Sequence, residues 1–465
     1  MLKRAAYEEL LNWKTSGAGK ALLVEGPRQV GKTYLIKAFA EREYDDYVLI
    51  DFVEDGDAAR QFASVNSAES VIQLVSLKAG RRLEPGRTLL FFDEVQRAPE
   101  IVTFSKYLVE DGRFDVVMSG SMLGVELGGV KSWPVGYLRV VSMWPLTFRE
   151  FCWANGVPRS VMESVRECYA SKKPLDEGIH QVLVNLYRQF LVIGGMPEAV
   201  QKSIDTSGDL GAVREVQDDL TTLYREDIAR YAQNRSVQVK AIYDSIPAQL
   251  SKENKRFKLQ AVKSGAKYER YAHDFEWLVA ARSAIKANRV TDPKPMLERS
   301  EQRERFKLYM SDTGMLLANY SASIAMGVIA GERSVNFGAV YENAVAQALA
   351  AAGSSVRYYN DSRKGEVDFL IEARDGKVLP IEVKSGKDYK VHTALNNLLG
   401  TQEYGIGHAV VLSEANLSVG ERQGKPVYYL PLYMEGLVAD EAATRASAKR
   451  ELEGFHLDPV TFPNS

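Results

Sequence analysis

The chain of 465 residues is constrained most by an apolar run at 21–24 that leads into Gly-x-x-x-x-Gly-Lys-Thr and then into a helix-like stretch at 34–40. A glycine-rich turn between a strand and a helix lets successive backbone N–H groups face a triphosphate. Lys32 would reach the β- and γ-phosphates, and the Thr33 hydroxyl would ligate Mg²⁺. The pattern therefore predicts a phosphate-binding turn made of Gly26, Pro27, Arg28, Gln29, Val30, Gly31, Lys32 and Thr33.

A second apolar strand, at 88–92, ends in the adjacent carboxylates Asp93 and Glu94. An acid at the tip of a neighbouring parallel strand can hold the magnesium shell, which is the role we expect for Asp93, while Glu94 can polarise the attacking water. An apolar strand that ends in Asp-Glu is common and usually marks only the edge of a sheet. The two motifs together make the prediction strong.

The next strand, at 114–118, runs into Ser119 and places a small polar side chain beside the expected γ-phosphate, with Ser121 as the second choice. A Ser-Gly-Ser segment is more often only a turn, so its position after the acidic strand carries this prediction. A further strand at 47–52 completes a βαβ pattern. That pattern predicts a parallel, doubly wound α/β sheet.

With these motifs, the N-terminal half resembles the AAA-type P-loop ATPases of bacteria and archaea. The resemblance rests on residues 26–33, 92–96 and 145–151, and it continues into 194–198, which look like the turn of a helical lid, and into 224–228. It implies a site for ATP and Mg²⁺, hydrolysis with Lys32 and Glu94 as catalytic residues, and room for assembly into a homo-oligomer. Such sites are commonly completed by an arginine; the candidates, between which the sequence does not choose, are Arg139, Arg149 and Arg225.

A second group of chemically active residues lies far downstream, where short apolar strands at 365–371 and 379–384 flank a turn at 374–377. Side chains alternate along a strand, so Glu382 and Lys384 share a face that can include Asp368. Two carboxylates with a lysine suit a Mg²⁺-dependent phosphodiesterase, because the acids hold the metal while the lysine orients water and offsets phosphate charge.

This segment resembles the PD-(D/E)xK superfamily, whose restriction-endonuclease-like fold implies a further acid on a preceding helix. The amphipathic stretch 338–349 supplies Glu342. The implied catalytic set is Glu342, Asp368, Glu382 and Lys384, with Asp368 and Glu382 as metal ligands. Two alternatives stay open: an acidic hairpin with ordinary solvent-facing ion pairs, and a fold of this type kept as a binding platform. Residues 306–317 and 341–343 extend the likeness to prokaryotic ATPases that carry a C-terminal domain of unknown function.

Residues 236–320 resemble a winged helix, with helices expected at 237–250, 259–264 and 267–281 and strands at 290–291 and 306–311. The segment 251–270 holds seven Lys or Arg against two Glu, with Phe257 and Tyr268 among them. A run of charge is usually a solvated face. In a chain with a net charge of −2, this local bias favours contact with DNA at 251–270.

Composition sets the remaining limits. The two cysteines, Cys152 and Cys168, lack metal-ligand spacing, and the chain begins without an apolar signal core, so we expect a reducing cytoplasm. No apolar stretch approaches the ~20 residues that span a bilayer, so no membrane partner is expected.

The expected organisation is a P-loop AAA-type core at 1–155, a helical lid at 156–235, a winged-helix domain at 236–320, a linker at 321–334 and a nuclease-like α/β domain at 335–435. A C-terminal helix and tail follow at 436–465, with the helix near 439–451. The leading hypothesis is an ATP-hydrolysing protein that acts on DNA and whose nucleotide state controls a Mg²⁺-dependent nuclease. The alternatives are an ATP-switched regulator that uses the C-terminal fold as a DNA or protein platform, and a signalling ATPase that assembles on sensing a ligand.

Overall fold

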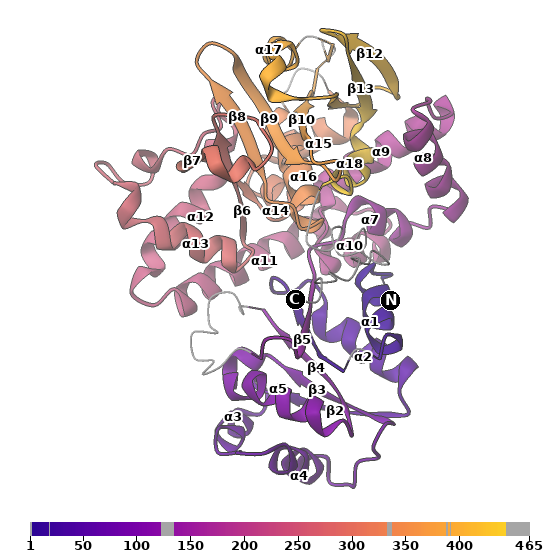
Figure 1. Cartoon of the computed structure of the whole chain (residues 1–465), viewed down its shortest axis with the longest axis vertical. Helices are drawn as coiled ribbons and strands as arrows, with labels where there is room; N and C mark the ends of the chain where they lie inside the picture. Colours follow the sequence, from indigo (N-terminus) through magenta and orange to yellow (C-terminus); the bar gives the residue numbers. More distant parts are fainter. Residues whose placement is uncertain are drawn as a thin grey trace, which may run out of the picture.

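The computed structural model describes residues 2–17, 19–121, 134–332, 337–386, 389–390 and 392–442. Two β-sheets lie toward opposite ends of the long axis of the molecule, and a layer of helices lies between them (Figure 1). The N-terminal sheet is at the bottom of the view and the C-terminal sheet at the top.

The N-terminal sheet has five strands in the order β2-β3-β4-β1-β5, and every pair is parallel. All six residues of β3 are buried, as expected for a strand that is covered on both faces. Helices α1 and α2 share one hydrophobic cluster with alternate residues of β1 and β3, while α3, α4 and α5 share a second cluster on the opposite face. The predicted doubly wound parallel sheet is confirmed. The strands are β1 (Ala21–Glu25), β2 (Asp46–Asp51), β3 (Thr88–Asp93), β4 (Asp115–Gly120) and β5 (Leu138–Ser142), and the helices are α1 (Ala6–Thr15), α2 (Lys32–Glu43), α3 (Gly56–Ala63), α4 (Ala68–Ala79) and α5 (Pro99–Asp111).

A helical layer follows the sheet. Its first helix starts at a capping box in which the Thr147 hydroxyl accepts from the backbone N–H of Glu150 while the Glu150 carboxylate accepts from the backbone N–H of Thr147. This accounts for part of the motif at 145–151. The layer contains α7 (Phe148–Ala154), α8 (Arg159–Ser171), α9 (Glu177–Ile193), α10 (Pro197–Asp205) and α11 (Leu210–Tyr231).

The glycines at 194–195 bring three parts of the chain together. Gly194 has φ +82°, the Asp312 carboxylate accepts from the Gly195 N–H at 2.6 Å, and the Gly195 carbonyl accepts from the Leu146 N–H at 2.6 Å. A Cβ at Gly195 would collide with the Leu146 carbonyl, so only glycine permits this approach. The motif thus ties the core, the helical layer and the segment before α14 to one another.

The region after residue 235 differs in part from the sequence expectation. The helix expected at 237–250 is confirmed as α12 (Ser236–Leu250), but 259–264 contain only a 3₁₀ turn, Leu259–Ala261, and the helix expected at 267–281 begins as a second 3₁₀ turn, Tyr268–Arg270. Glycine at 265 and serine at 264 follow the first turn and disfavour its extension. The linker expected at 321–334 contains α15 (Ala322–Ala330). The other elements are α13 (Ala272–Ala280), β6 (Ala284–Val290), β7 (Glu301–Met310) and α14 (Thr313–Ala318).

The C-terminal sheet has eight strands in the order β12-β13-β11-β10-β9-β8-β6-β7 and mixes parallel with antiparallel pairs. The hairpin expected at 365–384 is confirmed as the antiparallel pair β9–β10. The β6–β7 hairpin joins the sheet because β6 pairs with β8 in parallel, so one sheet crosses the boundary expected between 236–320 and 335–435. The elements are α16 (Gly338–Ala351), β8 (Arg357–Asp361), β9 (Gly365–Glu372), β10 (Val378–Val383), α17 (Thr393–Gly400), β11 (Ala409–Ser413), β12 (Ser418–Arg422), β13 (Lys425–Pro431) and α18 (Glu435–Ala439).

The helix expected near 439–451 lies mostly outside the described residues, which end at 442. Among the described helices, none combines the length and the apolar character needed to cross a membrane.

Candidate nucleotide site and acidic cluster

The turn between β1 and α2 has the backbone that its glycines predict. Gly31 takes φ +85° as the N-cap of α2, and Gln29 also lies in the left-handed region at φ +60°. A Cβ at Gly26 would collide with the Met143 carbonyl, so this glycine allows the turn to pass close to the end of β5. The turn leaves the first N–H groups of α2 directed at its own concave side, where an anion is favoured.

Lys32 lies inside this turn, and within the described part of the chain no carboxylate forms an ion pair with it. Its ammonium donates to the carbonyl oxygens of Gly26 at 3.0 Å and Pro27 at 2.8 Å. Burial lowers the pKa of Lys32 to about 8, although the carboxylates of Glu94 and Asp93 act in the opposite direction. A phosphate group at the turn would supply the counter-charge that this lysine lacks.

The expected magnesium ligands meet at the start of α2. The Thr33 hydroxyl donates to Asp93 Oδ2 at 2.5 Å, and the Ser119 hydroxyl donates to Asp93 Oδ1. Burial raises the pKa of Asp93 above its usual value, although both hydroxyl groups counter it. A hydroxyl and a carboxylate at the mouth of a phosphate-binding turn are donors that Mg²⁺ accepts, so the residues present fit a Mg²⁺–nucleotide complex.

Glu94 is held in a strained backbone conformation, with φ +54°. Its Oε2 accepts hydrogen bonds from the Gln96 amide and, at 3.2 Å, from the Ser121 hydroxyl. These bonds orient the carboxylate expected to polarise water, and they assign a structural role to the glutamine of the motif at 92–96.

Helix α11 reaches the phosphate-binding turn from a part of the chain about 200 residues downstream of it. Arg28 forms an ion pair with Asp227 at 2.6 Å, and the Tyr224 hydroxyl donates to the Arg28 carbonyl at 3.2 Å. Burial raises the pKa of Asp227 to about 6, against the opposing effect of Arg28. The motif at 224–228, for which the sequence predicted no contact, therefore touches the phosphate-binding turn directly.

Arg282, between α13 and β6, also reaches the end of β1, and the sequence analysis missed it. It has φ +53°, pairs with Glu25, donates to the Ser142 hydroxyl at 2.9 Å and lies over the Trp144 ring at 5.3 Å. Its Nη1 is buried with no hydrogen-bond partner among the described residues. Its charge contributes to lowering the pKa of Lys32. No sequence signal indicated it, because its positive φ is a property of the folded backbone that an arginine in the sequence does not predict.

Two of the three arginines that the sequence suggested are engaged elsewhere, and the third lies on β5. Arg225 pairs with Asp244 at 2.8 Å, Arg149 lies over the ring of Trp153 at 5.2 Å, and Arg139 is part of β5. Arg282, by contrast, is close enough to Lys32 to contribute to lowering its pKa.

Arg4 supports the turn from behind. Its guanidinium is paired with Glu150 at 3.1 Å and donates to the carbonyls of Val30 at 2.7 Å and Trp144 at 2.6 Å. Arg4, Val30 and Glu150 are all buried, and together they hold the middle of the turn against the start of α7.

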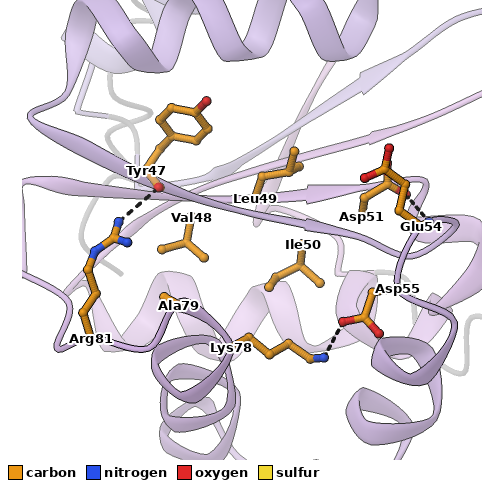
Figure 2. A pocket seen from close by; sticks show the side chains of 10 residues that line it. All are labelled: Tyr47, Val48, Leu49, Ile50, Asp51, Glu54, Asp55, Lys78, Ala79 and Arg81. Carbon is orange, nitrogen blue, oxygen red and sulfur yellow. Dashed lines mark hydrogen bonds and ion pairs between the residues drawn. The ribbon is translucent and has the colours of Figure 1, made fainter.

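A separate hollow of about 340 Å³ lies at the open edge of β2, away from these residues (Figure 2). Both cations that line it are already paired: Lys78 pairs with Asp55 at 2.5 Å, and Arg81 pairs with Asp46 and contacts the Tyr47 carbonyl. We assign no ligand to this hollow.

The C-terminal residues of the expected nuclease set do come together. Glu342 projects from α16, Asp368 from β9, and Glu382 and Lys384 from the end of β10; with Glu366 of β9, the four carboxylates form what we call the acidic cluster. Lys384 pairs with Glu382 at 2.7 Å, and the Val383 N–H donates to Asp368 Oδ2 at 2.8 Å.

An unexpected lysine lies among these acids. The Lys307 ammonium, from β7, is 2.7 Å from Glu366 Oε1, 3.3 Å from Glu342 Oε2 and 3.8 Å from Asp368 Oδ1. Lys255 pairs with the other oxygen of Glu342, and the Tyr309 hydroxyl donates to Glu342 Oε2 at 3.1 Å. Burial alone would lower the pKa of Lys307, but the surrounding carboxylates hold it well above its usual value.

The acids of the cluster respond differently to this environment. Burial opposes ionisation of Glu342, but Lys307 and Lys255 hold its pKa below the usual value. Burial, together with the charges of Glu342 and Glu382, raises the pKa of Asp368 well above its usual value.

Mg²⁺ does not fit the acidic cluster as the structure has it. Lys307 contacts three of the four acids, and its side chain is 1% exposed. Within the described part of the chain, no group of three or more His, Cys, Asp and Glu side chains is arranged to hold a metal ion.

The basic segment 251–270 is only in part the surface that the sequence predicted. Phe257 is buried and stacks on Phe306 with a centroid distance of 5.7 Å, so it belongs to the core rather than to a base-stacking face. Lys255 is turned inward to Glu342. The other basic side chains are exposed: Lys252, Arg256, Lys258, Lys263, Lys267 and Arg270.

Comparison with protein families divides the chain into three matched parts. Residues 18–152 match the family described as an AAA domain, residues 184–323 match a domain of unknown function (DUF8612), and residues 337–433 match a second one (DUF4143). No curated protein matches the chain.

Several solved structures show distant likeness. The Holliday junction branch migration motor RuvB of Thermotoga maritima is 12% identical over 66% of this chain and 92% of its own, with a TM-score of 0.29. The Aeropyrum pernix ORC1 protein, solved in complex with DNA, is 11% identical over 71% of this chain and 93% of its own, with a TM-score of 0.28. AMPPCP-bound DnaA of Aquifex aeolicus is 14% identical over 60% and 89%, with a TM-score of 0.26. At these TM-scores the function has to be argued from the residues of this chain.

The motif spacing, the parallel sheet and the family match agree for the first third of the chain. Residues 18–152 form an AAA-type P-loop ATPase domain, and it is followed by two regions that match families of unknown function.

Proposed function

We propose that this protein binds and hydrolyses ATP with Mg²⁺ at the turn 26–33. The observation that carries the proposal is the convergence of Lys32, the Thr33–Asp93 contact and the oriented Glu94 carboxylate at the tips of adjacent strands. Lys32 would neutralise phosphate charge, Thr33 and Asp93 would hold the metal shell, Glu94 would orient the attacking water, and Ser119 would position Asp93.

The same proposal makes the nucleotide site a switch for the rest of the chain. Two ion pairs link the site to residues outside 1–155: Arg28 of the turn pairs with Asp227 of α11, and Glu25, just before the turn, pairs with Arg282 from the segment before β6. Because β6 is part of the C-terminal sheet, phosphate charge at the turn would act on Arg28 and Arg282 and so bias the position of that sheet.

We further propose that the switched part is a DNA-binding platform. The exposed cations of 251–270 lie between the ATPase domain and the C-terminal sheet in sequence and carry the local charge that backbone phosphates require. The supporting observation against a cutting role is Lys307, which occupies the centre of the acidic cluster. Assembly into a homo-oligomer and the division into 1–155, 156–235, 236–320, 335–435 and 436–465 remain parts of this proposal.

The ATPase is tested by ATP binding and steady-state hydrolysis of the full chain. Glu94→Gln should retain ATP binding and lose hydrolysis by about 10²–10⁴-fold, because it removes the general base and little else. Glu110→Gln, on the exposed face of α5, is the matched control and should behave as wild type. Wild-type protein that binds no ATP, or equal hydrolysis in the two variants, would contradict the proposal.

DNA contact is tested by fluorescence polarisation with labelled duplex at several salt concentrations. Lys263→Glu with Lys267→Glu should weaken binding and flatten its salt dependence. Arg166→Glu with Lys173→Glu makes the same charge change on exposed residues at and after α8 and should leave the affinity near wild type. An equal loss of affinity in both double variants would mean that only the net charge of the protein matters, and it would contradict a DNA site at 251–270.

Metal-dependent DNA cleavage is the second candidate function, favoured by the convergence of Glu342, Asp368, Glu382 and Lys384. It requires that a metal take the place of Lys307. Cleavage of linear, single-stranded and four-way-junction DNA with Mg²⁺ or Mn²⁺, lost in Asp368→Ala and retained in Glu110→Gln, would establish it. If no DNA is cleaved while ATP hydrolysis is intact, the DNA-binding platform is the function that is supported.

A further inference from the structure

In the expected nuclease set the lysine that activates water is Lys384, which follows the strand that carries Glu382. Lys307 is different, because it comes from a strand that carries none of the four acids. It comes from β7, the edge strand of the sheet, while the acids come from α16, β9 and β10. Its backbone is fixed by pairing with Ala287 of β6, and its ammonium lies 5.1 Å from the centre of the Tyr358 ring. With an exposed fraction of 1%, the side chain is enclosed by protein.

The charges of the acidic cluster are nearly balanced without any metal. Glu342, Glu366, Asp368 and Glu382 face the three ammonium groups of Lys255, Lys307 and Lys384. A divalent cation bound between Glu342 and Asp368 would lie within contact distance of the Lys307 ammonium, and two like charges that close in a buried site repel strongly.

From these contacts we propose that Lys307 is the resident cation of the acidic cluster and that the cluster is a metal-free charge network. It ties β7 to α16 and β9, and Lys255 adds the basic segment to the same network. This inference rests on the platform function proposed above and gives it a structural basis. The residues that resemble a nuclease centre serve as a joint between the middle of the chain and the C-terminal sheet.

The network also contains the parts of a latent metal site. Removal of the Lys307 charge would leave Glu342, Glu366 and Asp368 without their shared partner. Glu382 Oε2, which is buried with no hydrogen-bond partner among the described residues, adds a further oxygen. The three carboxylates freed in this way, together with this fourth oxygen, are the kind of ligands that Mn²⁺ and Mg²⁺ prefer.

The test measures Mn²⁺ binding to the full chain, without nucleotide, by electron paramagnetic resonance. Every protein carries Asp93→Asn, so that the N-terminal metal position is silent. This background should bind no Mn²⁺ at millimolar concentration. Lys307→Met in the same background should bind one Mn²⁺ at least about tenfold more tightly, and adding Asp368→Asn should remove that binding. Lys286→Met, a half-buried lysine of β6 paired with Glu276, is the matched control and should bind none.

One outcome overturns the proposal even if Lys307→Met fails to fold. Mn²⁺ binding by the Asp93→Asn background that is lost on adding Asp368→Asn would mean that a metal displaces Lys307 in the natural protein. A folded Lys307→Met variant that binds no Mn²⁺ would equally contradict the latent site. ATP binding by the wild-type chain, measured in parallel, separates failure of this inference from failure of the ATPase proposal.

Discussion

Two buried lysines of this protein have opposite electrostatic environments. Among the residues that the structure describes, Lys32 contacts only carbonyl oxygens at short range, and burial lowers its pKa to about 8. Lys307 contacts three carboxylates, which hold its pKa well above the usual value despite complete burial. The positive charge of Lys32 is not balanced by an acid in contact with it within the described residues, whereas the positive charge of Lys307 is balanced by carboxylates of the protein itself.

The comparison separates a ligand site from a structural network without reference to motifs. A buried cation that the protein leaves uncompensated costs stability, so it persists where a ligand supplies the missing charge. A buried cation that the protein surrounds with acids leaves little attraction for a further cation. The sequence motifs made both regions candidates for Mg²⁺. We propose that the first takes Mg²⁺ together with the phosphates whose negative charge Lys32 lacks, and that the second takes none.

The largest expected effect concerns the ATPase. Lys32→Met should lower the ATP hydrolysis rate by about 10²–10³-fold, because the transition-state charge on the phosphates loses its buried cation. The midpoint of urea unfolding should be unchanged or slightly higher, because an uncompensated charge leaves the interior. Lys307→Met, measured in the same assay and the same denaturant series, should hydrolyse ATP near the wild-type rate and unfold at a lower urea concentration. This opposite result checks the comparison directly.

For Lys307→Met we expect a loss of about 3–5 kcal/mol in the free energy of unfolding, because acids are left buried without their cation. Adding Glu342→Gln should restore part of that loss, with a coupling energy of about 0.5–3 kcal/mol in a double-mutant cycle from denaturant unfolding. If the two single changes add without coupling, Lys307 and Glu342 do not form one network.

The pH dependence follows from the lowered pKa of Lys32. Phosphate binding requires the protonated amine, so nucleotide affinity should fall as pH rises through about 8, by up to about tenfold per unit. Stability has the opposite sign: the folded protein holds this proton less tightly than the unfolded chain, so the contribution of Lys32 rises with pH between about 8 and its usual value. Titration of ATP-analogue affinity in wild type and Lys32→Arg checks this, since arginine stays charged and should remove the dependence.

The smallest expected effect is at Arg282. Arg282→Gln should change ATP turnover roughly two- to fivefold, the scale of a partly exposed ion pair. It should also remove any change in Trp144 fluorescence on binding a non-hydrolysable analogue, with Trp144→Phe identifying that signal. Arg289→Gln, on β6 but bonded to the Asn360 carbonyl, is the control. An unchanged fluorescence response in Arg282→Gln would mean that the contact with Glu25 does not transmit nucleotide state.

Much of the N-terminal site could be predicted because its parts are local. Residues 26–33 define their own backbone, and strand tips such as Asp93 and Ser119 meet at one edge of any parallel sheet of this order. The β9–β10 hairpin and the helix of Glu342 were predictable for the same reason, since periodicity encodes an element and the face that it buries. The fold of residues 236–320, expected to be a winged helix, was harder to predict, because strand pairing of β6 with β8 joins residues that are far apart in sequence.

The sequence by itself determined the phosphate-binding turn, the acidic strand tip and the set of carboxylates that meet at the C-terminal sheet. Only the tertiary structure decided what stands opposite each of them: Arg282 beside Glu25, Asp227 beside Arg28, and Lys307 within the acidic cluster. The physical reason is that a motif encodes local backbone geometry. The counter-charge of a buried group comes from whichever distant strand or helix the fold places against it.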